Sequence, residues 1–139
     1  MNRSNIGTRI LVRLGFAAVG LVIFLISRST NLLQGDCGDT VVDNYIKAID
    51  AITDKSDVVF DKMTANNEAE TLAAYAKLAD EASNIEHPSC LDGTHSEVMI
   101  VMQKRQEALK YAYNGDTEKA DQLMKEADEH FDKANAAIP

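Results

Sequence analysis

Residues 39–63 read DTVVDNYIKAIDAITDKSDVVFDKM. Mostly apolar side chains recur along this stretch at alternating spacings of three and four residues. The recurring positions, all apolar except for one serine, are Val42, Tyr45, Ile49, Ile52, Ser56, Val59 and Met63. This spacing keeps one stripe facing one way over about six turns of helix. We therefore predict a long amphipathic helix, whose first turn is capped by Asp39 or Thr40.

Three further helices are marked by capping boxes, a proline stop and a glycine cap. The boundary signals are the pairs Asn67/Glu70, His87/Pro88, Thr94/Glu97, Asn114/Gly115 and Asp116/Thr117. The connections are short, about three to eight residues, and short connections favour antiparallel neighbours. The predicted fold class is all-α, an up-down-up-down four-helix bundle over residues 39–139.

The chain begins with a basic and then apolar segment. Residues 14–26 read LGFAAVGLVIFLI without a charge, Arg13 is the last of three arginines before them, and Arg28 follows. This asymmetry holds the N-terminus in the cytoplasm and sends the rest across the membrane. Counted from Ile10 the segment barely spans a bilayer, and Ser27-Arg28-Ser29 is a weak cleavage signal.

We therefore expect a basic tip and a retained single-pass membrane anchor within residues 1–30, and a linker over residues 31–38. Residues 39–139 form the extracytoplasmic domain. Secretion after cleavage of a signal peptide is the alternative.

The charge of the chain is divided between its two parts. From Asp36 onward there are ten basic and 22 acidic residues, a net charge of −12, whereas the residues before Asp36 carry four arginines and no acid. A domain this acidic repels phosphate backbones, which excludes nucleic acid as a partner, and it disfavours lying flat on anionic lipid. The expected partners are the membrane, through the N-terminal segment, and a protein.

The two cysteines, Cys37 and Cys90, precede the first and third predicted helices. In an up-down-up-down bundle these two helix starts share one end. A pair of cysteines in an exported domain is by default a disulfide. No Cys-x-x-Cys is present to favour a redox-active pair. We predict a structural Cys37–Cys90 disulfide.

No catalytic motif stands out. None of the three histidines belongs to a recognisable nucleophile motif, and the glycines form no phosphate loop. Covalent haem would need Cys-x-x-Cys-His, and a di-iron bundle would need Glu-x-x-His on two helices; neither pattern occurs. We expect no catalytic residue, no cofactor and no enzymatic activity, although a site assembled from scattered carboxylates is a third alternative.

One group of residues indicates a metal site. His95, Met99 and Met102 follow one another at i, i+4 and i+7 and so share a face of the third helix. Imidazole and thioether ligands suit copper(I). The competing interpretation is that the methionines fill the core, as methionine at helical spacing usually does.

Residues 108–134 carry a local pattern, with Tyr113-Asn114-Gly115-Asp116 followed by Ala120. This stretch is similar to a segment of a tetratricopeptide repeat, a family whose stacked helix pairs bind peptides. The tryptophan and the 34-residue recurrence of that family are absent from this sequence. We interpret the similarity as convergence of helical hairpins.

The function expected from the sequence is that of a membrane-tethered extracytoplasmic helical module, which binds a protein or a small ligand without catalysis. The alternative is extracytoplasmic copper binding through the His/Met face of the third helix.

Overall fold

The recurrence of apolar side chains and the interruptions between them set the helices of this chain. The computed structural model describes residues 37–139. Its elements are α3 (Asp39–Asp61), α4 (Glu68–Ser83), the 3₁₀ turn η2 (Ser89–Leu91), α5 (Asp92–Tyr113) and α6 (Thr117–Ala136). Within residues 37–139 there are four α-helices and no strand, so the predicted all-α class is confirmed for this range.

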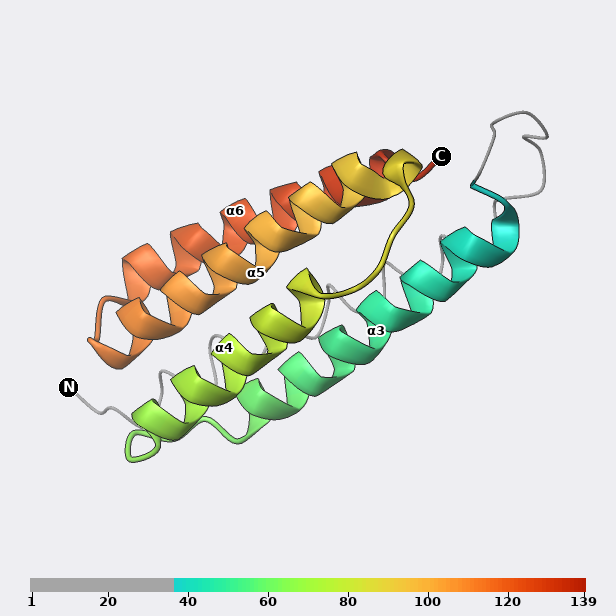
Figure 1. Ribbon diagram of the computed structural model, residues 1–139. Helices are drawn as coiled ribbons and strands as arrows, with labels where there is room; N and C mark the ends of the chain where they lie inside the picture. Colours follow the sequence, from blue (N-terminus) through green and yellow to red (C-terminus); the bar gives the residue numbers. More distant parts are fainter. Residues whose placement is uncertain (1–36) are drawn as a thin grey trace.

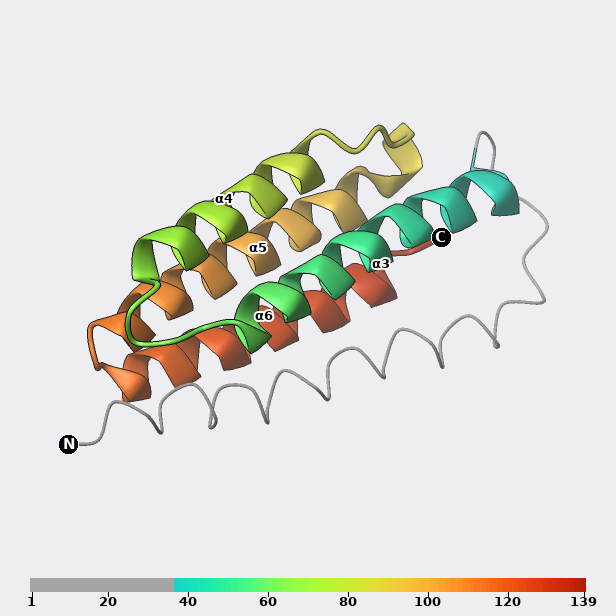
Figure 2. The same cartoon turned by 90° about the horizontal axis from the view of Figure 1, so that it is seen from below.

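Successive helices run in opposite directions and lie side by side in sequence order (Figure 1). The view from below shows the four helices gathered into a bundle (Figure 2). The starts of α3 and α5 and the end of α6 therefore lie together. We call this the disulfide end, because Cys37 and Cys90 are located there, and we call the opposite end the distal end.

The stripe predicted along α3 is largely the buried face of that helix. Five of its seven positions, from Val42 to Ser56, are buried, and Val59 and Met63 are partly buried. The stripe left out two buried residues, Ile46 and Phe60, and Phe60 is only 1% exposed. Its ring packs edge-to-face on Tyr75 of α4, with ring centroids 5.6 Å apart, so an aromatic pair joins α3 to α4 in the core.

Two of the predicted helix caps, at α3 and α5, are wrong, and a third, at α4, has the predicted residue without the predicted hydrogen bond. Gly38 precedes α3, and no side chain caps that helix. Asn67 does precede α4, but its side chain accepts from the Thr64 amide and donates to the Lys62 carbonyl, closing the loop before the helix. Helix α5 begins at Asp92, so Thr94 lies inside it and is buried.

The caps at the α5–α6 turn agree with the prediction. The Asp116 side chain accepts from the Lys119 amide at 3.0 Å. Gly115 adopts φ +82°, the left-handed conformation that a glycine cap supplies.

The core consists of two clusters. The larger one surrounds Phe60, Tyr75 and Leu109 and includes residues from all four helices. The smaller one lies at the disulfide end, where Tyr45 and Leu91 are buried beside the two cysteines. The hydroxyl-bearing ring of Tyr45 therefore lies in mostly apolar surroundings at the disulfide end.

None of the helices that the structure describes is long and apolar enough to cross a membrane. The anchor or signal segment predicted within residues 1–30, and most of the linker, lie outside the described residues.

Candidate functional site

Cys37 and Cys90 are joined by a disulfide at the disulfide end, with their Cα atoms 6.3 Å apart. The bond ties the residues before α3 to the 3₁₀ turn before α5. This confirms the predicted pairing, and both cysteines of the chain are used.

Beside the disulfide, three rings from three segments form what we call the imidazole cluster: Tyr45 of α3, His87 of the α4–η2 link and His95 of α5. The two imidazoles stack, with centroids 3.9 Å apart and planes 21° from parallel. The Tyr45 ring meets each of them edge-on, at 6.1 and 6.0 Å. The three rings therefore join α3 to the start of α5, at the same end of the bundle as the disulfide.

The hydrogen bonds of the cluster assign its protons. Nδ1 of His87 lies 3.0 Å from the Ile85 carbonyl oxygen, and a carbonyl only accepts, so Nδ1 of His87 donates. Its Nε2 lies 3.3 Å from a carboxylate oxygen of Asp92. Both ring nitrogens thus face acceptor oxygens, an arrangement that a protonated imidazole satisfies completely.

His95 has the opposite arrangement. Its Nδ1 lies 3.1 Å from the Tyr45 hydroxyl. Burial raises the pKa of Tyr45 to about 12, so the phenol keeps its proton and can donate it to Nδ1. Burial, and next the charge of His87, lower the pKa of His95, while Asp92 acts in the other direction. A neutral His95 is the form that fits these contacts.

The three residues of the predicted His/Met face have different neighbours in the structure. Met102 is 5% exposed, and its sulfur accepts a hydrogen bond from the Tyr75 hydroxyl at 3.7 Å. Met99 is partly buried against the larger core cluster. His95 instead joins His87. Among residues 37–139, no group of three or more His, Cys, Asp or Glu side chains is placed to hold a metal ion. The copper site stays a prediction.

A second unusual feature lies in the middle of the bundle. Arg105 of α5 is buried, with only 4% of its surface exposed. Its nearest carboxylate oxygen within the described residues is that of Asp128 on α6, 4.0 Å from Nη2. Burial raises the pKa of both Asp57 and Asp128, and the charge of Arg105 partly offsets that rise in each. Arg105 therefore lies between carboxylates of α3 and α6.

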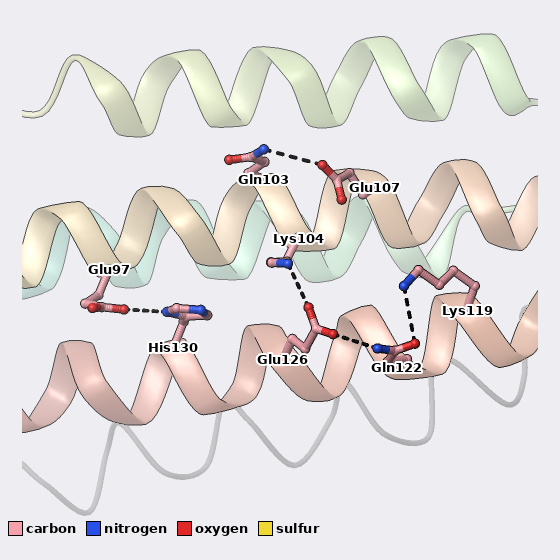
Figure 3. A network of polar contacts seen from close by, with 8 residues as sticks. All are labelled: Glu97, Gln103, Lys104, Glu107, Lys119, Gln122, Glu126 and His130. Carbon is pink, nitrogen blue, oxygen red and sulfur yellow. Dashed lines mark hydrogen bonds and ion pairs between the residues drawn. The ribbon is translucent and has the colours of Figure 1, made fainter.

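Polar pairs on the surface hold α5 against α6 (Figure 3). Nδ1 of His130 donates to Glu97 at 2.6 Å, and the Lys104 ammonium donates to Glu126 at 2.7 Å. Gln122 extends the second pair along α6 by donating to Glu126. Pairs that are partly exposed to solvent, as these are, contribute little to stability individually. They fix the register of two helices whose outer faces are strongly charged.

Comparison with models of protein families, with curated proteins and with solved structures finds no significant match to this chain.

Sequence reasoning missed Tyr45, His87 and Arg105 as members of polar clusters. Tyr45 was assigned to the apolar stripe, and His87 was interpreted only as the end of a helix. Arg105 continues the series Val98, Met102, Leu109 on the inner face of α5, at spacings of four, three and four. That spacing indicates a position on the buried face of α5, but arginine is rarely buried, so the residue type favours the opposite interpretation.

Proposed function

We propose that this chain is a membrane-tethered helical module on the extracytoplasmic side, which acts without catalysis by binding a protein or a small ligand. The observation that carries the proposal is the Cys37–Cys90 disulfide at the end where the chain enters the bundle. Disulfides persist in oxidising compartments and are rare in the cytosol. The basic and apolar segment before this end supplies the means of export.

The same placement supports an orientation. Because the linker joins α3 at Cys37, the disulfide end faces the membrane and the distal end faces away. Helix α3 has 23 residues, and a helix rises 1.5 Å per residue, so the distal end stands about 35 Å farther out. The distal part of α5 exposes Tyr111, one of three large hydrophobic residues exposed in the described part of the chain. An exposed tyrosine is a common anchor in protein interfaces.

Two experiments test the proposal. In the first, reporters active only in the cytoplasm or only after export are fused after Pro139. We expect the exported reporter alone to be active, and activity of the cytoplasmic reporter would refute the location. In the second, a photo-crosslinking residue replaces Tyr111 at the distal end or Asp43 near the disulfide end. A discrete adduct from the distal position alone is expected. No adduct from either position would count against a protein partner.

Copper binding is the second candidate, and one observation favours it: His87 places a second imidazole beside His95. Imidazole nitrogen is a good copper ligand. The test is metal analysis of the detergent-extracted full chain after incubation with copper(I) and ascorbate. Stoichiometric copper that is lost in a His95→Ala variant would support this candidate, and retention in that variant or absence of copper would contradict it.

A further inference from the structure

Arg105 borders a small cavity in the interior of the bundle. The cavity has a volume of about 20 Å³ and is lined by α3, α5 and α6. Thr53 and Ser56 line it from α3, Arg105 from α5, and Phe131 from α6. The remaining lining is aliphatic apart from the sulfur of a methionine. The polar side chains of Thr53, Ser56 and Arg105 therefore line a cavity that is otherwise apolar.

Oγ of Ser56 and Nε of Arg105 make no hydrogen bond of good geometry within the described residues. Both side chains do lie near the Tyr75 hydroxyl, and their interaction with it partly offsets the rise in the pKa of Tyr75 that burial causes. Ser56 is 1% exposed and Arg105 is 4% exposed, so bulk solvent does not reach them. A buried donor or acceptor that stays unpaired costs about 1–3 kcal/mol, and more for a charged group. The chain therefore gains by placing a partner between them.

The chemistry of the two atoms defines the partner. Nε–H of Arg105 can only donate, whereas a serine hydroxyl both donates and accepts. Thr53 donates its hydroxyl to the Ile49 carbonyl at 3.1 Å, which leaves its oxygen free to accept. The partner must accept from Arg105 and can donate to Ser56 or Thr53. Water meets this description, and a cavity of about 10–15 Å³ or more holds one molecule.

We propose that this cavity is a binding site for one ordered water molecule, which bridges Ser56 of α3 to Arg105 of α5. A small anion would also accept from Arg105. It would, however, lie close to the carboxylates of Asp57 and Asp128, which interact with the same guanidinium, and like charges repel. The neutral ligand is therefore favoured. This inference is independent of the proposed function.

The direct test is a high-resolution crystal structure of the full wild-type chain in its disulfide-bonded form, with and without soaking of the crystals in bromide. We expect a single density peak within hydrogen-bond distance of Ser56 Oγ and Arg105 Nε, without anomalous signal from bromide. An empty cavity overturns the proposal. A bromide signal at the same position overturns it equally, since it would make the ligand an anion.

A thermodynamic cycle in the full chain gives a second readout. Ser56→Val fills part of the cavity and expels the water, leaving Nε of Arg105 unpaired, so the melting temperature should fall. Arg105→Met removes the group that needs the water. In the double variant the valine should then be tolerated, and the loss caused by Ser56→Val should be reduced. If Ser56→Val lowers the melting temperature equally in the wild type and in the Arg105→Met variant, a water bridge between the two residues is contradicted.

Discussion

The imidazole rings of His87 and His95 stack 3.9 Å apart, and their ring nitrogens face different partners. His87 faces the Ile85 carbonyl and the Asp92 carboxylate, whereas Nδ1 of His95 accepts from the Tyr45 hydroxyl. A proton on Nδ1 of His95 would oppose donation by the Tyr45 hydroxyl, and burial of His95 disfavours its charged form. The stack at the disulfide end is therefore sensitive to pH.

We predict that His95 makes the domain less stable as the pH falls. The pKa of His95 is lowered in the folded chain, so below about pH 6.5 the unfolded chain binds more protons at this residue. The free energy of unfolding then falls as the pH falls from about 6.5 through the lowered pKa. Urea unfolding between pH 5 and 8 measures this slope, which should be smaller in His95→Gln.

Carboxylates act in the opposite direction and at lower pH. Asp50, Asp57 and Asp128 have raised pKa values, chiefly through burial. Their protonation therefore stabilises the fold as the pH falls through these raised values. Because His95→Gln retains all three carboxylates, the difference between the two pH profiles isolates the histidine. Parallel profiles for the two proteins would disprove the role of His95.

The disulfide should be a large contributor to stability. It closes a loop with a sequence separation of 53 residues, which corresponds to roughly 4 kcal/mol in the chain-entropy model. We predict that reduction lowers the melting temperature by about 15 °C or more for a domain of about 100 residues. Calorimetry with and without a reductant measures this. A Cys37→Ala/Cys90→Ala variant is the control, and its melting temperature should not respond to the reductant.

The features of this fold that could be predicted are those encoded by neighbouring residues. The α3 stripe and the Asn114-Gly115 cap are local patterns, and the disulfide follows once the helix starts are known to share an end. Helix starts were less accurate: Gly38, and not Asp39, precedes α3, because the flanking backbone decides which residue takes the cap position. Such boundaries commonly shift by one or two residues.

The imidazole cluster could not be predicted for a different reason. His87 lies in an irregular link, so no helical period indicates which way its side chain points. Only the path of the chain from α4 to η2 places it against His95. Arg105 shows the reverse case, since its position in the α5 series predicted burial while its charge predicted exposure.

Two glycines should respond to alanine with opposite signs. Gly115 has φ +82°, a conformation that alanine adopts only with strain, so Gly115→Ala should destabilise the domain by about 1 kcal/mol. Gly93 lies inside α5 with no atom near the position of an added Cβ. Gly93→Ala should therefore stabilise by up to about 1 kcal/mol. Denaturant midpoints measure both, and effects of the same sign would be inconsistent with this turn geometry.

The final prediction concerns the carboxylates around Arg105. Its charge partly offsets the rise in the pKa of Asp57 and of Asp128, whereas the pKa of Asp50 is raised by burial and by Asp54. We predict that Arg105→Met raises the pKa of Asp57 and Asp128 further and leaves that of Asp50 unchanged. Methionine keeps most of the side-chain volume, and the carboxylates that lose their partner remain accessible to water, because Asp128 is exposed and Asp57 is only partly buried. The fold should therefore persist.

Carbon-detected NMR titration of the aspartate carboxyl groups measures all three values in one sample, with Asp50 as the internal control. The higher pKa values also have a thermodynamic consequence. The folded variant binds more protons than its unfolded chain over a wider pH range than the wild type does. Its free energy of unfolding should therefore rise more steeply on acidification. If the three aspartates of the variant titrate as in the wild type, Arg105 does not interact electrostatically with α3 and α6.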